Sequence, residues 1–240
     1  PGEMRQAEKL QADNERDLTA LRDLTKDIDE KVYLTVKELF RLNKIPIIIG
    51  GGHNNAYPII RACSEHHQRP LSVVNIDPHT DYRRIEGRHS GNGFRYARQE
   101  AYLDRYAVFG LHENYNAQDI LTEFEEDEGL HYTSFEQLLL GTDEERSQQW
   151  LNLLHWLGTN APGLEVDCDS ITGFPVSAYN PSGFSLNEVR KYLRMIAQFR
   201  KPEYLHLAEA SPGRAETTLE KTGIGKALAY LVSDFIKARG

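Results

Sequence analysis

The stretch LSVVNIDPHTDYR, residues 71–83, joins an apolar run to a cluster of acidic and imidazole side chains. Asp77, His79 and Asp81 follow the run at every second position. Alternate side chains of an extended backbone lie on one face, so these three side chains would converge at the end of a buried strand. Taken alone, the pattern is explained equally well by a polar loop whose side chains cap a turn. It predicts a metal site only if other strand ends supply further ligands.

Composition limits the class of protein. The chain has 240 residues, of which 40% are hydrophobic and 27% are charged, which predicts a soluble α/β domain with a substantial core. No apolar run approaches the ~20 residues that span a membrane, and no signal-peptide pattern opens the chain, so we expect a cytoplasmic protein. The net charge of −8 argues against a nucleic-acid partner and favours a small-molecule substrate. Cys63 and Cys168 lack the spacing of a disulfide framework or a zinc site.

Alternating strand and helix patterns predict a three-layer α/β/α sandwich with a mainly parallel sheet, formed by a single domain over residues 1–240. Strands are expected at residues 44–49, 71–74, 107–111, 130–133, 163–169 and 204–212. The β-branched run at residues 44–49 is typical of a strand buried on both faces. Residues 1–43 carry helical spacing and predict two helices, and we expect that a strand upstream of them is missing.

Further predicted strand ends carry polar side chains. Three glycines precede His53 and let the backbone turn sharply after the first strand. Asp167 and Asp169 close a later strand, and Glu209 lies in an apolar strand, where a buried charge needs a partner. Open parallel sheets bind ligands at the carboxyl ends of their strands, so we expect these residues to meet the first cluster there.

The G-G-x-H turn, the D-x-H-x-D segment and the D-x-D segment occur in this order over about residues 45–212. Together with Glu209 they resemble the ureohydrolase superfamily, which includes arginase, agmatinase and formimidoylglutamase. The resemblance implies six metal ligands: His53, Asp77, His79, Asp81, Asp167 and Asp169. It also implies two Mn²⁺ ions per subunit, bridged by a hydroxide that attacks a guanidinium or formimidoyl carbon. Carboxylate and imidazole ligands without a thiolate independently favour such a cation over structural zinc.

The resemblance implies a role for each residue. One ion is expected to bind His53, Asp77, Asp81 and Asp169. Around the other ion, or between the two, we expect Asp77, His79, Asp81, Asp167 and Asp169. Glu209 would bind the cationic nitrogens of the substrate, and Asp81 would protonate the leaving group.

Departures from the arginase pattern favour a formimidoylglutamase. Gly52 stands before His53, where arginase and agmatinase usually have aspartate. Gly93 follows Ser90-Gly91-Asn92, and no histidine stands shortly after this segment, where arginase has its proton shuttle. The usual Asp-Pro after the D-x-D segment is replaced by Gly173-Phe174-Pro175. We therefore predict hydrolysis of N-formimidoyl-L-glutamate to glutamate and formamide.

Two polar loops at the predicted sheet edge supply candidate substrate contacts. Arg83 stands where arginase has an asparagine that helps to hold the α-carboxylate of its substrate, and Arg84 and Arg88 are close to it in sequence. Arginine binds carboxylates through paired charged hydrogen bonds, so we expect a substrate with an acidic tail. Solvated loop charges are the alternative interpretation of these arginines. Asn92 and His112, in the two loops, are further expected substrate contacts.

Two other functions stay open at this point. One is a urea-releasing guanidino hydrolase similar to agmatinase or arginase, and the other is a catalytically silent family member that binds metal. The presence of every expected ligand together with Glu209 favours an active enzyme. The resemblance also implies a homo-oligomer, either a trimer or a hexamer.

Overall fold

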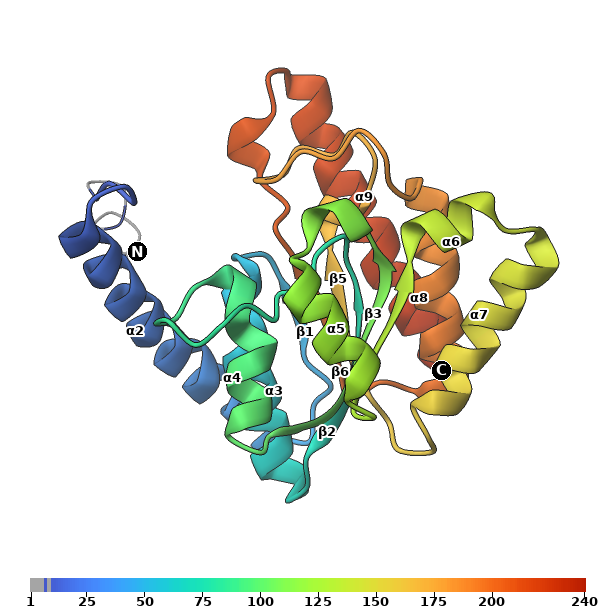
Figure 1. The fold of residues 1–240 in the computed structure, drawn as a ribbon, viewed down its shortest axis with the longest axis horizontal. Coiled ribbons are helices and arrows are strands. Elements are labelled where there is room, and N and C mark those ends of the chain that lie inside the picture. Colours follow the sequence, from blue (N-terminus) through green and yellow to red (C-terminus); the bar gives the residue numbers. More distant parts are fainter. Residues whose placement is uncertain (1–6, 8–9) are drawn as a thin grey trace.

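The computed structural model describes residue 7 and residues 10–240, and these residues form a six-stranded parallel sheet with helices on both faces (Figure 1). The strands are β1 (Ile47–Ile49), β2 (Leu71–Ile76), β3 (Leu103–Leu111), β4 (Leu130–Ser134), β5 (Gly163–Asp167) and β6 (Tyr204–Ala208). Their order across the sheet is β1-β6-β5-β2-β3-β4, and each neighbouring pair is parallel. The predicted three-layer α/β/α sandwich is confirmed.

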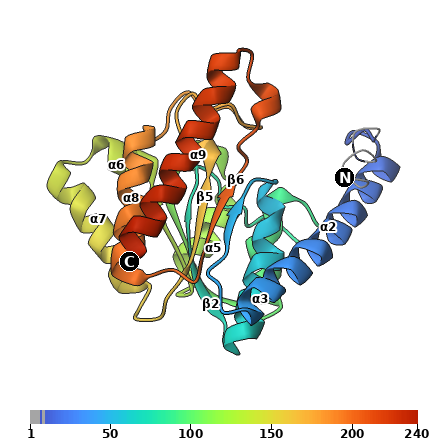
Figure 2. The ribbon, with the colours of Figure 1, turned by 180° about the vertical axis from the view of Figure 1, so that it is seen from behind.

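Helices form the two outer layers. Those that pack on one face are α2 (Glu15–Arg41), α3 (Ala56–His67), α4 (Gly93–Gln99) and α5 (Gln118–Glu126). Those on the other face are α6 (Phe135–Leu140), α7 (Asp143–Trp156), α8 (Leu186–Arg200) and α9 (Thr218–Arg239). Figure 2, which views the molecule from the opposite side, shows α8 and α9 side by side in front of the sheet. In the part of the chain that the structure describes, no helix is long and apolar enough to cross a membrane.

Strand β2 shows how the sheet separates two apolar cores. Leu71 and Val73 pack with α2, α3 and α4, whereas Val74 and Ile76 pack with the helices of the opposite layer. This alternation follows from the two-residue period of a strand that is covered on both faces. Because all strands run in one direction, the carboxyl ends of β1, β6, β5 and β2 lie side by side at one edge of the sheet.

The prediction that residues 44–49 form a strand buried on both faces is wrong. Strand β1 has only three residues, and within the described residues its only partner in the sheet is β6. Its last side chain, Ile49, is 55% exposed. The β-branched run favoured a strand, but its place at the edge of the sheet leaves it incompletely covered.

The predicted pair of N-terminal helices differs from the structure. Residues 15–41 form one helix of 27 residues, whose first amides bond to the Asn14 side chain. Two groups of apolar residues with helical spacing, at positions 18–28 and 32–40, suggest separate helices, but no glycine or proline lies between them to break the helix. The remainder of that prediction falls largely on residues 1–6 and 8–9, which lie outside the described residues.

A buried ion pair ties α2 to the loop that follows β2. Arg88 Nε lies 2.7 Å from Asp29 Oδ2, and both residues are almost completely buried. The same guanidinium donates to the carbonyl oxygen of Asn54 at 2.9 Å and to Asn92 Oδ1 at 2.6 Å. Arg88 is therefore neither a solvated loop charge nor a candidate substrate ligand. It joins helix α2, the turn that contains Asn54 and the loop that contains Asn92.

We expect Asp29→Ala to lower the free energy of unfolding by about 3–5 kcal/mol, because the Arg88 charge would stay buried without its partner. Urea denaturation measures this change. Asp23→Ala is a matched control in the same helix. The Asp23 side chain is 62% exposed and pairs with Lys26 at the surface, so its loss should cost less than about 1 kcal/mol. Equal costs for the two variants would contradict a structural role for the buried pair.

Candidate metal centre

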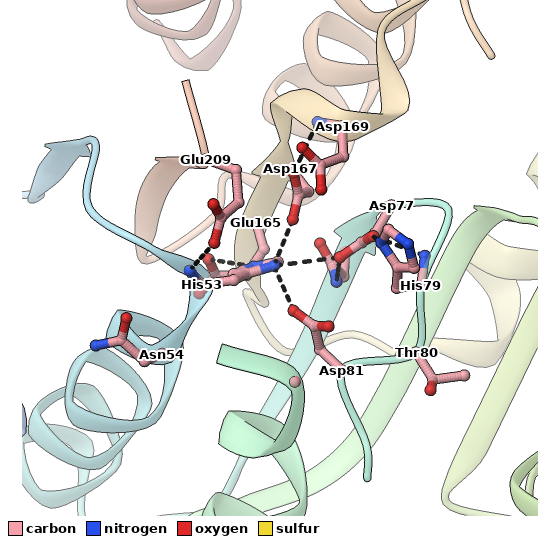
Figure 3. Close-up of polar contacts among 12 residues, drawn as sticks. His53, Asn54, Asp77, His79, Thr80, Asp81, Glu165, Asp167, Asp169 and Glu209 are labelled. Atoms are coloured by element: carbon pink, nitrogen blue, oxygen red, sulfur yellow. Dashed lines mark hydrogen bonds and ion pairs between the residues drawn. The ribbon is translucent and has the colours of Figure 1, made fainter. Parts of the chain in front are cut away.

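The predicted site residues leave the sheet at the carboxyl ends of neighbouring strands (Figure 3). His53 Nδ1 lies 2.9 Å from Asp81 Oδ2, 3.0 Å from Asp167 Oδ2 and 3.2 Å from Asp77 Oδ2. One ligand atom of each of these four residues lies within 4.8 Å of the others. The structure thus brings together side chains that are more than 100 positions apart in the sequence.

The side chains converge because the backbone turns, and not because it stays extended as the sequence predicted. Strand β2 ends at Ile76, and Asp77 Oδ1 then accepts a hydrogen bond from the His79 amide at 2.7 Å. Asp81 has a φ of +45°, in the left-handed region that residues other than glycine rarely adopt. Glu209, after β6, has a φ of +60°. Strained backbone of this kind persists where the surrounding structure holds it, often at functional sites.

The second acidic segment also turns. Strand β5 ends at Asp167, whose Oδ1 accepts from the Asp169 amide at 2.7 Å and begins the 3-10 helix Cys168–Ser170. Asp167, and not Asp169, therefore belongs to the group around His53. This differs from the expected division of ligands, which placed Asp169 with His53. Asp169 and His79 lie beside the group, with His79 Nδ1 at 3.4 Å from Asp77 Oδ1.

Crowding of like charges changes the acidity of the group. Burial and the neighbouring carboxylates raise the pKa of Asp167 to about 7 and that of Asp169 to about 9. Burial lowers the pKa of His79, but the neighbouring carboxylates of Asp77, Asp81 and Asp167 together outweigh burial and raise the pKa to about 9. For His53, interactions with four carboxylates likewise outweigh burial and hold the pKa well above its usual value. The protein alone cannot keep all of these carboxyl groups ionised at neutral pH.

These properties fit a divalent cation. The donor set consists of four carboxylates and two imidazoles, without a thiolate, which suits a hard or borderline metal ion. Asp169 Oδ1 is buried and has no hydrogen-bond partner among the described residues. A cation would compensate the negative charge and satisfy such an oxygen.

A cavity of about 610 Å³ opens above this group. His79, Asp81 and Asp169 reach it, and Glu209 stands on its wall. Glu209 Oε1 accepts from the His53 amide at 2.8 Å, and Oε2 accepts from Ser177 Oγ at 2.9 Å. The carboxylate of Glu209 is thus held beside the metal-ligand group and faces the cavity.

The predicted substrate contacts lie in different places. Arg83 lines the cavity and is exposed, with Glu86 at 3.5 Å. Asn92 is completely buried and bonds to Arg88 and to the carbonyl oxygen of Gly87, behind the cavity wall. His112 is also buried, and its ring stacks between Tyr115 and Phe135. Only Arg83 of these three predicted contacts reaches the cavity surface in this structure.

Sequence reasoning missed two residues below the group. Glu165 and His206 are fully buried in β5 and β6, with Glu165 Oε2 at 2.6 Å from His206 Nδ1. Glu165 also lies 3.5 Å from His53 Nε2. A signal was available, because each is a polar residue between apolar neighbours in a predicted strand. Like Glu209, Glu165 is a charged residue in an apolar strand and therefore needs a buried partner.

We expect the metal-free protein to lose stability as the pH rises from about 6.5 to 9. The pKa values of Asp167, Asp169 and His79 are all raised in the folded protein, so folded chains bind more protons than unfolded chains in this range. Their stabilising contribution is complete below the unfolded pKa values and is lost as the pH passes the folded ones. Thermal unfolding in EDTA measures this change. Saturating Mn²⁺ should weaken or reverse the trend, because cations favour the ionised carboxylates. A metal-free protein that becomes more stable over this pH interval would contradict the raised pKa values of these three groups.

Comparison with known proteins adds independent information. Residues 3–232 match the Arginase family. A formimidoylglutamase of Macrococcus caseolyticus is 29% identical over 170 residues, which cover 70% of this chain and 54% of that protein. Arginase 2, chloroplastic/mitochondrial, of Arabidopsis thaliana is 30% identical over 176 residues, covering 71% of this chain and 48% of that protein. The chain thus spans about half the length of these relatives.

Solved structures show a similar fold. Formimidoylglutamase from Bacillus subtilis gives a TM-score of 0.77 at 18% identity and covers 88% of this chain and 66% of that one. Formiminoglutamase of Trypanosoma cruzi with Mn²⁺ gives a TM-score of 0.74 at 20% identity, covering 89% and 71%. At these identities, the likeness establishes the architecture of the sheet and its helices.

Proposed function

Because the chain belongs to the arginase family, we propose that it is a metal-dependent hydrolase of the C–N bond of linear amidines, with N-formimidoyl-L-glutamate as its substrate. The observation that carries the proposal is the group of three carboxylates within 3.2 Å of His53 Nδ1, next to a cavity that a small molecule can enter. Formimidoylglutamases among the relatives support the choice of substrate.

We propose that two Mn²⁺ ions bind here. His53, Asp77, Asp81 and Asp167 would hold one ion, and His79 and Asp169 would bind the other. Asp77 can serve both, because its Oδ2 faces His53 while its Oδ1 faces His79. When bound, the ions would lower the pKa of water and so supply a nucleophile at neutral pH.

Two acidic residues of the chain would bind the substrate and move a proton. Glu209 presents a carboxylate held by the His53 amide and Ser177 Oγ, which suits the cationic nitrogens of an amidine. Asp81 reaches both the cavity and the metal-ligand group. Its carboxylate would accept the proton that the attacking water releases and deliver it to the leaving amine, here the amino group of glutamate.

A urea-releasing guanidino hydrolase is the second candidate, and the similarity to the Arabidopsis arginase favours it. One experiment separates the possibilities. The purified chain is analysed for bound metal and then assayed for formamide from N-formimidoyl-L-glutamate and for urea from arginine and agmatine. Formamide release supports the proposal, and urea release supports the second candidate. Bound metal without either product would indicate a silent family member.

We expect Asp77→Ala and Asp169→Ala to lose bound metal and hydrolysis together, because each leaves two cations with too little negative charge. Atomic emission measures the metal content. Asp119→Ala is the matched control, since Asp119 also lines the cavity but pairs with Arg84 at 2.7 Å, away from the ligand group. Two Mn²⁺ per chain in either ligand variant would show that the assignment is wrong.

We propose that Arg83 binds an acidic tail of the substrate. It reaches the cavity, and its contact with Glu86 is long enough to be exchanged for a substrate carboxylate. Arg83→Ala should raise KM for formimidoylglutamate about tenfold or more, equivalent to the loss of a charge-assisted bond of ~1.5–3 kcal/mol. Arg84→Ala is the control, because Arg84 is already paired with Asp119. If the KM of the Arg83 variant is unchanged while metal content is normal, the acidic tail is bound elsewhere or is not required.

We also propose a cytoplasmic homo-oligomer, a trimer or a hexamer, on the basis of the resemblance to ureohydrolases. Sedimentation equilibrium of the metal-loaded protein should show a mass that is three or six times the 27.4 kDa of one chain. A species of 27.4 kDa at all concentrations would rule out this assembly for the chain.

A further inference from the structure

Three polar side chains lie in a row below the metal-ligand group. Asn75 of β2 is opposite Glu165 of β5, and Glu165 is opposite His206 of β6. All three side chains are completely buried. Polar groups at this depth are costly unless they are bonded, so the contacts of each member show what the row does.

Glu165 is fixed by two partners. Its Oε1 accepts a hydrogen bond from the Tyr204 hydroxyl at 2.8 Å, and its Oε2 lies 2.6 Å from His206 Nδ1. His206 is held in turn, because its Nε2 faces the carbonyl oxygen of Gly50 at 3.4 Å, in the turn that leads to His53. The carboxylate therefore has little freedom to reorient.

His53 lies between this carboxylate and the metal-ligand group. Its Nε2 faces Glu165 Oε2 at 3.5 Å, while its Nδ1 faces Asp77, Asp81 and Asp167. Figure 3 shows the imidazole between these two sets of oxygens. The residue is only 1% exposed, and its Nε2 has no hydrogen-bond partner among the described residues, so the contact with Glu165 at 3.5 Å is an ion-pair contact in this structure. Solvent is thus a poor alternative partner for Nε2.

We propose that Glu165 is a positioning residue for His53. Fixed by Tyr204 and His206, it holds the proton of His53 on Nε2 and leaves the lone pair of Nδ1 directed at the metal site. A carboxylate that accepts from the second nitrogen of a ligand histidine selects its tautomer and fixes its ring. This inference rests on the proposed metal-dependent function.

The other end of the row supports the same role. Asn75 Nδ2 donates to Asp77 Oδ2 at 2.8 Å and to the Tyr106 hydroxyl at 3.0 Å. Tyr106 in turn donates to the carbonyl oxygen of Thr80 at 2.8 Å. Two members of the row therefore contact ligands of the metal site from below, since Asn75 contacts Asp77 and Glu165 contacts His53.

The test compares Mn²⁺ affinity, measured by calorimetric titration, in two backgrounds. Glu165→Gln in the wild-type chain should weaken binding tenfold or more. The same substitution in a His53→Ala chain should change affinity by less than about twofold, because Glu165 would act through His53. Asp234→Asn is the matched control. Asp234 is a buried carboxylate between Arg190 and Arg194, remote from the site, and its loss should leave affinity unchanged.

The outcomes are distinguishable. If the wild-type chain does not bind Mn²⁺, both the proposed function and this inference fail. If the wild-type chain binds but Glu165→Gln binds equally well, or if the variant weakens binding equally in both backgrounds, only the inference is overturned. A second measurement, on the wild-type chain, tests the inference even if Glu165→Gln does not fold. In the Zn²⁺-loaded protein, ¹⁵N NMR of His53 should show a protonated Nε2 and a metal-bound Nδ1, and the opposite arrangement would overturn the inference.

Discussion

Repulsion among buried carboxylates is the constraint on which the rest of this site depends. Several acidic side chains meet within a few ångströms at one edge of the sheet, where each raises the free energy of the others. A sheet edge built from separate strands can assemble such a group, because each strand contributes one or two side chains and is stabilised by its own core contacts. The helices on both faces supply apolar burial that offsets this local cost.

Much of the fold and of the ligand set could be predicted from residue type and order. Apolar runs followed by polar clusters located the strand ends, and acidic and imidazole side chains at those ends identified the candidate ligands. The left-handed backbone at Asp81 and the 3-10 turn after Asp167 could not be predicted. Both depend on contacts made by the folded chain, and both decide which carboxylate faces which histidine. The strand pattern therefore located the site, but it could not predict that Asp167 is the carboxylate of this segment that groups with His53 in the structure.

Two further residues show where sequence patterns lose information. Arg88 looked like one of three surface arginines, yet it is buried against Asp29, which is 59 positions away in the chain. Glu165 looked like part of a strand leading to Asp167, yet its partners come from β6 and from the turn after β1. In both cases the role of the residue depends on a partner that is distant in sequence. The periodic pattern of apolar and polar residues along a helix or strand does not reveal such a partner. The chemistry of the residue was visible, but its partner was not.

The Arg88 guanidinium has a consequence for how the molecule opens. Helix α2 cannot move away from the sheet without exposing an arginine that also holds the turn after β1 and the loop beside the cavity. These segments are distant in sequence but share one buried cation, so they would open together as one cooperative unit. Amide protons along α2 and in the cavity loop would then exchange with solvent through a common opening. Through this coupling, helix α2 contributes to the order of a metal-ligand group to which it supplies no ligand.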